Sequence, residues 1–255
     1  MTVPRQLVVP GRFNGPPDSA NGGYVAGLLA EVFHSAAGTT PATPVTVTLR
    51  QPPPLDAPME AAWEGDRLDL TFGAAVLATA ERGRLTYDRV SPVSLPVAAE
   101  AEQGYAGLRA HPFPTCFVCG PDRGAGDGMG LRPGPVGRSG GFFFSGGGPD
   151  PVGRVACTWT PGESMPSFRG TVTPALQWAA LDCPSGWASD IEARPMVLGR
   201  ITAAIHALPH IGDRCVVVAR VLSQQGRKTY AASTVYDADG RVLGRAEATW
   251  IAKTL

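Results

Sequence analysis

Two segments of the chain, far apart in the sequence, follow the same plan. The first begins with Asn-Gly-Gly-Tyr at residues 21–24 and continues as an apolar helical run to about residue 36. The second begins at residues 169–174 and leads into the apolar stretch that carries Asp182 and ends near residue 188. Both runs are small and apolar on nearly every face, which predicts buried helices. Strand-like sequence follows each one, so the order of elements predicts a tandem duplication.

Each predicted helix is followed by segments with strand character. In the first half these are residues 45–51, 59–64, 67–72 and 74–81, and in the second half residues 196–208, 214–224, 228–236 and 241–252. Gly226 and Gly240 supply the positive φ that tight antiparallel hairpins need. One buried helix followed by an antiparallel meander, twice over, predicts the α+β class, with each curved sheet wrapped around its own helix.

A segment rich in Gly and Pro, residues 112–153, separates the two halves. It holds few strand-like or helix-like runs apart from three consecutive Phe residues at 142–144. Such a composition is typical of a connector. We therefore expect an N-terminal unit at residues 1–110, a connector with a Cys-x-x-Cys pair at 111–140, and a C-terminal unit at 141–255.

Composition limits the classes of function. The 22 basic and 22 acidic residues cancel, so no net field attracts nucleic acid or an anionic membrane, although a local basic patch for a phosphate-bearing ligand remains open. The start of the chain lacks an export signal, and no apolar run is long enough to cross a bilayer uninterrupted, which favours a cytoplasmic protein. The five scattered cysteines are then expected to be reduced thiols.

The start of the first helix carries a chemical prediction. A buried helix with a glycine-rich first turn presents free backbone N–H groups at its positive end, and a carboxyl group on a neighbouring buried helix would lie where those donors point. Gly22 and Gly23 are the candidate donors, and Asp182 is the candidate carboxyl group. Cleavage of an acyl ester needs such donors for the developing oxyanion, and a carboxylate that either attacks directly or deprotonates water.

These features resemble a known family. The Asn-Gly-Gly-Tyr sequence at 21–24 is similar to the start of the first central helix in hotdog-fold acyl-CoA thioesterases, and residues 212–250 resemble their last three strands. The resemblance covers essentially the whole chain apart from the connector and is to the double-hotdog form. It implies two tandem hotdog units, each a curved antiparallel sheet around a central helix, and a thioesterase that acts on acyl-CoA or on an acyl-carrier thioester.

The resemblance also implies a site built across the contact between the two units. Carried onto this chain, Gly22 and Gly23 donate N–H groups beside Asn21, and Asp182 is the acid/base or the nucleophile. The residues expected to bind the substrate are Tyr24, Thr173, Glu31 and Arg123. No metal or bound cofactor is expected, because coenzyme A enters as part of the substrate. Exposed edge strands of such units often pair, so a homodimer is also expected.

Each of these residues also has a structural alternative. Asn21 is a common type of helix cap. Gly22 and Gly23 can serve the close packing of the helix against the sheet, while Glu31 can pair internally with an Arg. Asp182 can be a carboxylate held by a neighbouring hydroxyl or Arg. If the catalytic group is missing, the protein is instead a non-hydrolytic acyl-thioester binding protein.

The second half departs from the family in two places. Where some relatives have His-Gly-Gly, residues 168–172 read Phe-Arg-Gly-Thr-Val, and Pro174 has no N–H to donate. We therefore expect one working site per chain. Pro184 is expected to bend or end the second helix close to Asp182.

The connector holds the remaining candidate groups. Cys116 and Cys119, with His111 nearby, resemble part of a zinc site, but a structural site usually needs four ligands and no second cysteine pair stands at useful spacing. We expect these two thiols to act as small apolar side chains that pin the connector to the body. Arg123 is available for the phosphates of coenzyme A, or else lies in a solvated loop. Cys183 has no His at a telling spacing to activate it as a nucleophile.

Overall fold

The computed structural model describes residues 5–124, 126–137 and 154–253 of the 255-residue chain. No helix in this described part has the length and the apolar run needed to cross a bilayer. The phenylalanine run at 142–144 and the predicted boundary between residues 140 and 141 fall outside the described residues.

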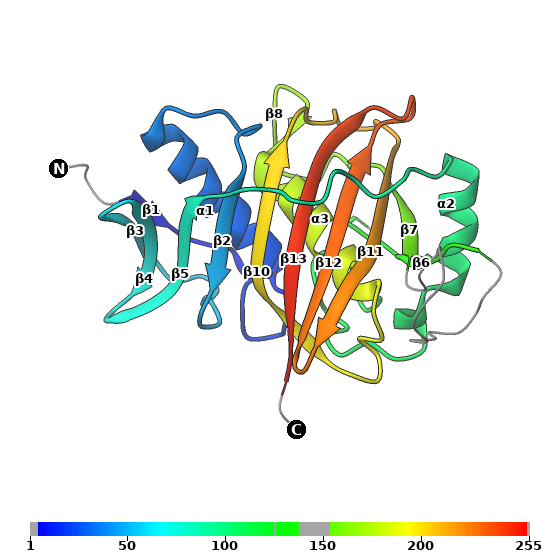
Figure 1. Ribbon diagram of the computed structural model, residues 1–255, viewed down its shortest axis with the longest axis horizontal. Helices are drawn as coiled ribbons and strands as arrows, with labels where there is room; N and C mark the ends of the chain where they lie inside the picture. Colours follow the sequence, from blue (N-terminus) through cyan, green and yellow to red (C-terminus); the bar gives the residue numbers. More distant parts are fainter. Residues whose placement is uncertain (1–4, 125, 138–153, 254–255) are drawn as a thin grey trace.

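Two long helices lie against the same face of one large antiparallel sheet (Figure 1). The helices of the described residues are α1 (Gly22–Ala37), α2 (Leu95–Ala101), α3 (Pro174–Trp187) and the short 3-10 turns η1 (Gly11–Phe13), η2 (Glu102–Gly104) and η3 (Ala106–Leu108). The strands of the first half are β1 (Arg5–Leu7), β2 (Val45–Leu49), β3 (Met59–Glu64), β4 (Arg67–Phe72) and β5 (Ala75–Arg82). Those of the second half are β6 (Gly134–Pro135), β7 (Arg154–Trp159), β8 (Ser167–Phe168), β9 (Thr171–Val172), β10 (Met196–Ile205), β11 (Cys215–Gln225), β12 (Lys228–Tyr236) and β13 (Val242–Ala252).

The sheet is continuous across both halves of the chain. Its order is β1-β3-β4-β5-β2-β10-β13-β12-β11-β7-β6, while β8 and β9 form a separate hairpin. The halves meet where β2 pairs with β10, with Thr46 opposite Thr202 and their hydroxyl oxygens 2.8 Å apart. Outward from this junction, the order β2-β5-β4-β3-β1 recurs as β10-β13-β12-β11-β7. A large antiparallel sheet with few helices agrees with the predicted α+β class.

Helices α1 and α3 cross at very short range because α1 presents glycines to α3. A Cβ added at Gly23 would lie 2.4 Å from the Cβ of Asp182, and one added at Gly27 would lie 2.5 Å from the Cα of Ala175. The two glycines are four residues apart, so they lie on one face of the helix. Small residues at such positions let two helix backbones approach closely. Gly23 therefore packs against the other helix, and only Gly22 packs near the sheet, against Leu49 and Leu198.

Both predicted helices are confirmed, and the strand predictions are confirmed in their centres. Of the two expectations for Pro184, an end of the helix at this residue is wrong, because α3 continues through it to Trp187. The described elements that were not predicted are β1, α2, β6, β7, the hairpin of β8 and β9, and the 3-10 turns η1, η2 and η3. Arg169 and Gly170 form the tip of that hairpin, with φ of 53° and 78°. The segment before α3 is thus a hairpin followed by a proline, whereas α1 begins with two glycines.

The segment between β5 and α2 crosses the opposite face of the sheet from the two long helices (Figure 1). The N–H of Tyr87 donates to Oε1 of Glu247 at 2.7 Å, and the N–H of Val90 donates to Oγ1 of Thr234 at 3.0 Å. This segment carries the chain from the first half to the far end of the second, where α2 packs against β7 and β11.

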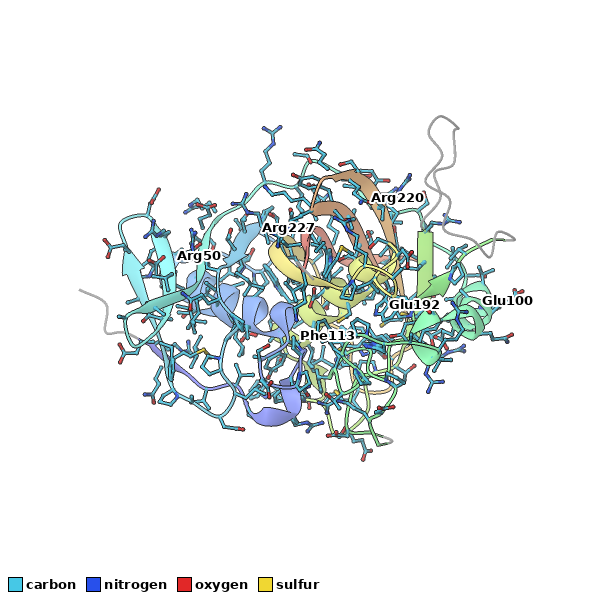
Figure 2. The ribbon with its side chains drawn as sticks, turned by 90° about the horizontal axis from the view of Figure 1, so that it is seen from below. Arg50, Glu100, Phe113, Glu192, Arg220 and Arg227 are labelled. Atoms are coloured by element: carbon cyan, nitrogen blue, oxygen red, sulfur yellow. The ribbon has the colours of Figure 1, made fainter. Side chains whose placement is uncertain are left out.

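The described part of the connector is packed onto the body. Seen from below, Phe113 of the connector lies near the middle of the view, and its ring centre is 5.4 Å from Nζ of Lys253 (Figure 2). Phe117 is fully buried, and its N–H donates to the carbonyl of Asn14 at 2.8 Å. The connector is therefore close enough to the start of α1 to contribute side chains beside it.

The crossing of α1 and α3 yields the first prediction, for the variant Gly27→Val. The new side chain would collide with the backbone of α3 at Ala175, and overpacking of this kind costs about 1–3 kcal/mol of unfolding free energy. Urea unfolding measures the loss. Ser35→Val, on the exposed side of the same helix, is the matched control. Equal stability of the two variants would contradict the close crossing.

Candidate functional site

The first turn of α1 meets the side chain of Asp182. The first N–H groups of a helix have no partner inside it. Here the N–H of Tyr24 donates to Oδ1 of Asn21 at 2.9 Å, and the N–H of Gly23 donates to Oδ2 of Asp182 at 2.9 Å. The N–H of Gly22 has no acceptor among the described residues. The structure thus brings Asn21, both glycines and Asp182 together and leaves one donor uncommitted.

Asp182 is a buried carboxyl group with one free oxygen. Its exposed fraction is 1%, and its Oδ1 has no hydrogen-bond partner in the described structure. Burial raises the pKa of Asp182 to about 7, although the N–H of Gly23 acts in the opposite direction. The positive end of α1, equivalent to roughly half an elementary charge, offsets part of the cost of keeping a carboxylate here. One oxygen is held by the helix start, and the other is buried without a partner among the described residues.

The backbone that carries Asp182 is fixed by hydrogen bonds to its neighbours. Oγ of Ser185 donates to the carbonyl of Asp182 at 2.7 Å and accepts from Nε1 of Trp250 at 2.8 Å. Oγ of Ser233 donates to the carbonyl of Leu181 at 2.6 Å. These bonds tie α3 to β12 and β13 on both sides of Asp182, so the carboxyl group is presented from a rigid element.

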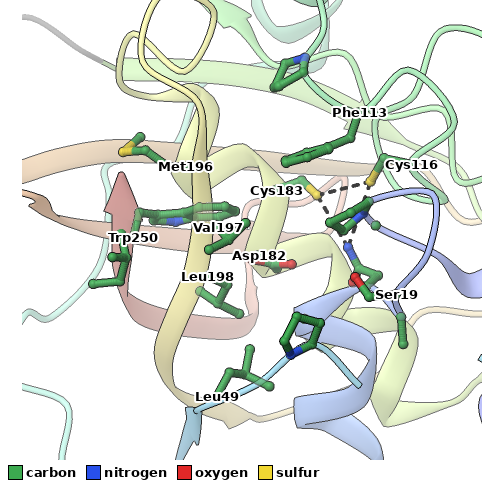
Figure 3. A pocket seen from close by; sticks show the side chains of 18 of the residues that line it. Ser19, Leu49, Phe113, Cys116, Asp182, Cys183, Met196, Val197, Leu198 and Trp250 are labelled. Carbon is green, nitrogen blue, oxygen red and sulfur yellow. Dashed lines mark hydrogen bonds between the residues drawn. The ribbon is translucent and has the colours of Figure 1, made fainter. Parts of the chain in front are cut away.

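A cavity of about 490 Å³ opens beside this contact (Figure 3). Asn21, Gly22 and Asp182 form part of its wall. Apolar side chains, among them Leu198 and Trp250, form much of the rest. Ligand pockets for small molecules are typically this size, with a mostly apolar lining and a few polar groups that fix orientation. The free N–H of Gly22 and the free oxygen of Asp182 are such groups.

Two exposed cations lie on the rim of the cavity. Arg50 follows β2, and Lys253 follows β13, where its Nζ lies 5.4 Å from the ring centre of Phe113. Sequence reasoning missed both, because neither lies in a motif and they become neighbours of the cavity only through the pairing of the two halves. An anionic part of a ligand would meet them at the entrance.

A second carboxylate repeats the contact in the opposite direction. Oε1 of Glu31, about two turns into α1, accepts from the N–H of Ala175 at the start of α3, at 3.0 Å. Pro174 occupies the preceding position and has no N–H. The expected pairing of Glu31 with an Arg is wrong for the described residues, where its hydrogen-bond partner is this backbone N–H. Each helix start therefore receives a carboxylate from the other helix, but only Asp182 borders the cavity.

The four residues predicted to bind substrate do not line the described cavity. Tyr24 is buried and stacks on Phe13, with ring centres 4.2 Å apart. Thr173 is the N-cap of α3. Glu31 holds the start of α3, as described above. Arg123 is bound inside the connector, where its guanidinium pairs with Asp127 at 2.7 Å. Arg123 is therefore neither a solvated loop residue nor a free cation.

Three thiols share one wall of the cavity. Cys116 and Cys119 of the connector and Cys183 of α3 have sulfur atoms within 4.8 Å of one another. They are the residues of the described chain that come closest to a metal-binding set. Cys183 follows Asp182 directly, so the cluster and the carboxyl group are neighbours.

Comparison with known proteins identifies the fold. No family model matches the sequence, and no curated protein matches it. Among solved structures, a candidate thioesterase from Novosphingobium aromaticivorans DSM 12444 is 15% identical with a TM-score of 0.62, over 98% of this chain and 95% of that one. A candidate thioesterase II from Thermobifida fusca YX is 11% identical with a TM-score of 0.61, over 100% and 94%. A hot dog fold protein of unknown function from Alicyclobacillus acidocaldarius is 14% identical with a TM-score of 0.59, over 98% and 93%. The chain has the hotdog fold of these thioesterase-like structures along nearly its whole length.

The contact of Glu31 predicts a pH-dependent stability. Burial raises the pKa of Glu31 in the folded chain, and the N–H of Ala175 opposes this shift. Because the pKa of Glu31 is higher in the folded chain than in the unfolded chain, its protonated form adds to the free energy of unfolding. This contribution is complete below the unfolded pKa and is lost as pH rises through the folded pKa. Glu31→Gln, which keeps an acceptor oxygen, should therefore melt at a higher temperature than the wild type at neutral pH. The difference should shrink as pH falls towards 4.5, the value for an unperturbed Glu. Thermal melts across this range measure it, and a variant less stable at neutral pH would oppose the prediction.

Proposed function

We propose that this chain is a thioesterase that hydrolyses acyl-CoA or a related acyl thioester at the cavity beside Asp182. The observation that carries the proposal is the contact of Gly23 with Asp182, next to a free N–H and an apolar cavity. The hotdog fold of the similar thioesterase-like structures supports the same reaction class. Fold alone does not specify function, so the chemistry rests on these groups.

The proposed reaction uses one water molecule. The acyl chain lies along the apolar wall, and its thioester carbonyl accepts from the N–H of Gly22. Oδ1 of Asp182 takes a proton from water, whose oxygen attacks the carbonyl carbon. The positive end of α1 stabilises the tetrahedral oxyanion. The carbon–sulfur bond then breaks, Asp182 returns the proton to the departing sulfur, and a carboxylic acid and a thiol are released.

This mechanism revises the roles expected from the sequence. Gly22 and Gly23 were both predicted to donate to the oxyanion. Because the N–H of Gly23 is engaged by Asp182, we assign the oxyanion to Gly22 and the orientation of the carboxylate to Gly23. Asn21 acts as the cap that holds this turn, since its oxygen is used by Tyr24. No cofactor is required beyond the coenzyme A carried by the substrate.

We further propose that the chain consists of two tandem hotdog units that together make one working site. The recurring strand order on either side of the β2–β10 junction supports this division. The proposed boundaries stay at residues 110 and 140, although α2 packs against the second half. Of the two exchanged carboxylates, only Asp182 has a cavity beside it, which favours a single site. The strands β1 and β6, each paired on one side, are the proposed edges for a homodimer.

The decisive variant is Asp182→Asn. The amide oxygen can still accept from Gly23, but the side chain cannot take a proton from water, so kcat should fall roughly 100- to 10,000-fold. Release of free thiol from acyl-CoAs of several chain lengths measures turnover, and thermal melting checks the fold. Glu31→Gln is the matched control, because it neutralises the corresponding carboxylate away from the cavity.

Retained turnover in Asp182→Asn would refute the assigned base. Wild-type protein that binds an acyl-CoA but releases no thiol from any of them would identify the non-hydrolytic binding protein instead. Equal losses in Asp182→Asn and Glu31→Gln would show that both variants act through the helix contact and not through the cavity.

The cations on the rim predict recognition of the phosphates of coenzyme A. Arg50→Ala and Lys253→Ala should each raise KM for acyl-CoA roughly 2- to 5-fold, the effect of one exposed ion pair. Neither should change KM for an acyl-pantetheine thioester, which lacks the nucleotide. Arg241→Ala, at the other end of β13, is the control. Equal effects on both substrates would exclude a phosphate contact at the rim.

A further inference from the structure

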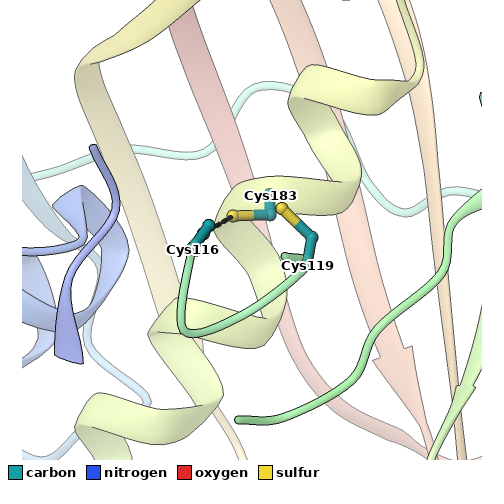
Figure 4. Close-up of side chains that lie close together, drawn as sticks. All are labelled: Cys116, Cys119 and Cys183. Atoms are coloured by element: carbon teal, nitrogen blue, oxygen red, sulfur yellow. Dashed lines mark hydrogen bonds between the residues drawn. The ribbon is translucent and has the colours of Figure 1, made fainter. Parts of the chain in front are cut away.

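Three thiols from two distant parts of the chain converge beside the cavity (Figure 4). Cys116 and Cys119 lie three residues apart in the connector, and Cys183 projects from α3. Each is at most 6% exposed. The expectation that two cysteines without a second pair bind no metal was based on sequence spacing alone. The fold supplies a third thiol that spacing could not indicate.

The separation of the sulfur atoms fits coordination of a common ion. A zinc–sulfur bond is about 2.3 Å long, and two ligands at the corners of a tetrahedron are about 1.63 bond lengths apart, which gives about 3.8 Å. Sγ of Cys116 and Sγ of Cys183 are 3.8 Å apart. All three sulfur atoms lie within 4.8 Å of one another, so small side-chain rotations bring the set to tetrahedral edges.

Two N–H donors face the sulfur atoms. Nδ2 of Asn21 lies 3.9 Å from Sγ of Cys116 and 3.7 Å from Sγ of Cys183. Nε1 of Trp187 donates to Sγ of Cys119 at 3.3 Å. A neutral thiol is only a weak acceptor, whereas a thiolate gains from charge-assisted hydrogen bonds. Every sulfur of the cluster thus has an outer partner of the kind that supports metal thiolates.

His111 is unsuited to the fourth position as it stands. Its Nδ1 accepts from the N–H of Phe113 at 2.9 Å, which places the proton of the neutral ring on Nε2. A protonated nitrogen cannot bind a metal. Because all three cysteines approach the cavity, a fourth position would face that space and be open to water or another small ligand.

We propose that Cys116, Cys119 and Cys183 form a binding site for a thiophilic divalent metal ion, zinc in particular. Thiolate ligands select such ions over magnesium or calcium. Each thiol that becomes a ligand loses its proton to the solvent. The ion would pin the connector to α3 directly after Asp182. This site is independent of the hydrolysis proposed above.

The chain contains its own controls. Cys157 lies in β7 and Cys215 in β11, both fully buried and both outside the cluster. Substitution of a buried cysteine that serves only packing should leave metal binding unchanged, whichever strand or helix carries it. A coordinating cysteine should differ from these two in any measurement that depends on the metal.

Cobalt titration of the full chain tests the proposal. Metal-free, reduced protein is titrated with Co²⁺, which reports thiolate ligands by a charge-transfer band and tetrahedral geometry by its visible absorption. We expect one equivalent per chain, release of the cobalt by added Zn²⁺, and a higher melting temperature with zinc. Cys116→Ser, Cys119→Ser and Cys183→Ser should each weaken binding at least roughly 100-fold, since loss of an outer partner alone costs 10- to 100-fold. Cys157→Ser and Cys215→Ser should bind as the wild type does.

Three outcomes would overturn the proposal. The first is the absence of a charge-transfer band in wild-type protein, a measurement that does not depend on how any variant folds. The second is loss of binding in the two control variants to the same extent. The third is a disulfide between Cys116 and Cys183 in freshly purified protein, shown by alkylation and mass spectrometry, which would make the cluster a redox pair. Turnover of thioesters is not used as a readout, so failure here leaves the proposed hydrolysis standing.

Discussion

The close crossing of α1 and α3 is the contact on which the rest of the structure depends. Gly23 and Gly27 place no side chain of α1 in the crossing, so the backbone of α1 lies directly against Asp182 and Ala175 of α3. At that distance the first free N–H groups of one helix reach a carboxylate that projects from the other. A buried charge without such a partner is strongly unfavourable in a protein interior. The glycines and the two acidic residues therefore depend on one another: the glycines allow the close approach, and the N–H groups brought close by it stabilise the buried carboxylates.

The two carboxylates share a contact but differ in surroundings. Asp182 has a second oxygen without a partner and a cavity beside it. Glu31 holds the start of α3, where a proline has removed the preceding donor. A helix start can stabilise a negative charge for structural reasons alone. Among the described residues, only the Asp182 contact has an adjoining cavity and a free N–H donor, and these two features distinguish it from the Glu31 contact.

Local patterns in the sequence predicted local structure well. The small apolar runs gave both helices nearly to their ends, and the glycines at 226 and 240 marked real turns because positive φ is a local demand. Helix α2 was not predicted because its seven residues are too few to show a helical period, and β7 was not predicted because it follows the Gly/Pro-rich segment directly. The pairing of Asp182 with Gly23 required a resemblance to a family, since nothing in the spacing joins them. Arg50 and Lys253 reach the cavity, and Cys183 reaches the other two thiols, only through long-range packing. Motifs and spacing in one sequence do not reveal such contacts.

The continuous sheet has a consequence for how the molecule holds together. Strands β2 and β10 are paired, an N–H at the start of each long helix donates to a carboxylate of the other, and the N–H of Tyr87 donates to Glu247 of β13. Neither half is complete by itself. Separation of the halves would leave the two carboxyl groups without their N–H donors and would expose the edges of β2 and β10. Thermal unfolding of this protein is therefore expected to be a single cooperative transition. Either half expressed alone would need another protein surface in place of the missing half. Because both halves belong to one polypeptide, each half always has the other at high effective concentration.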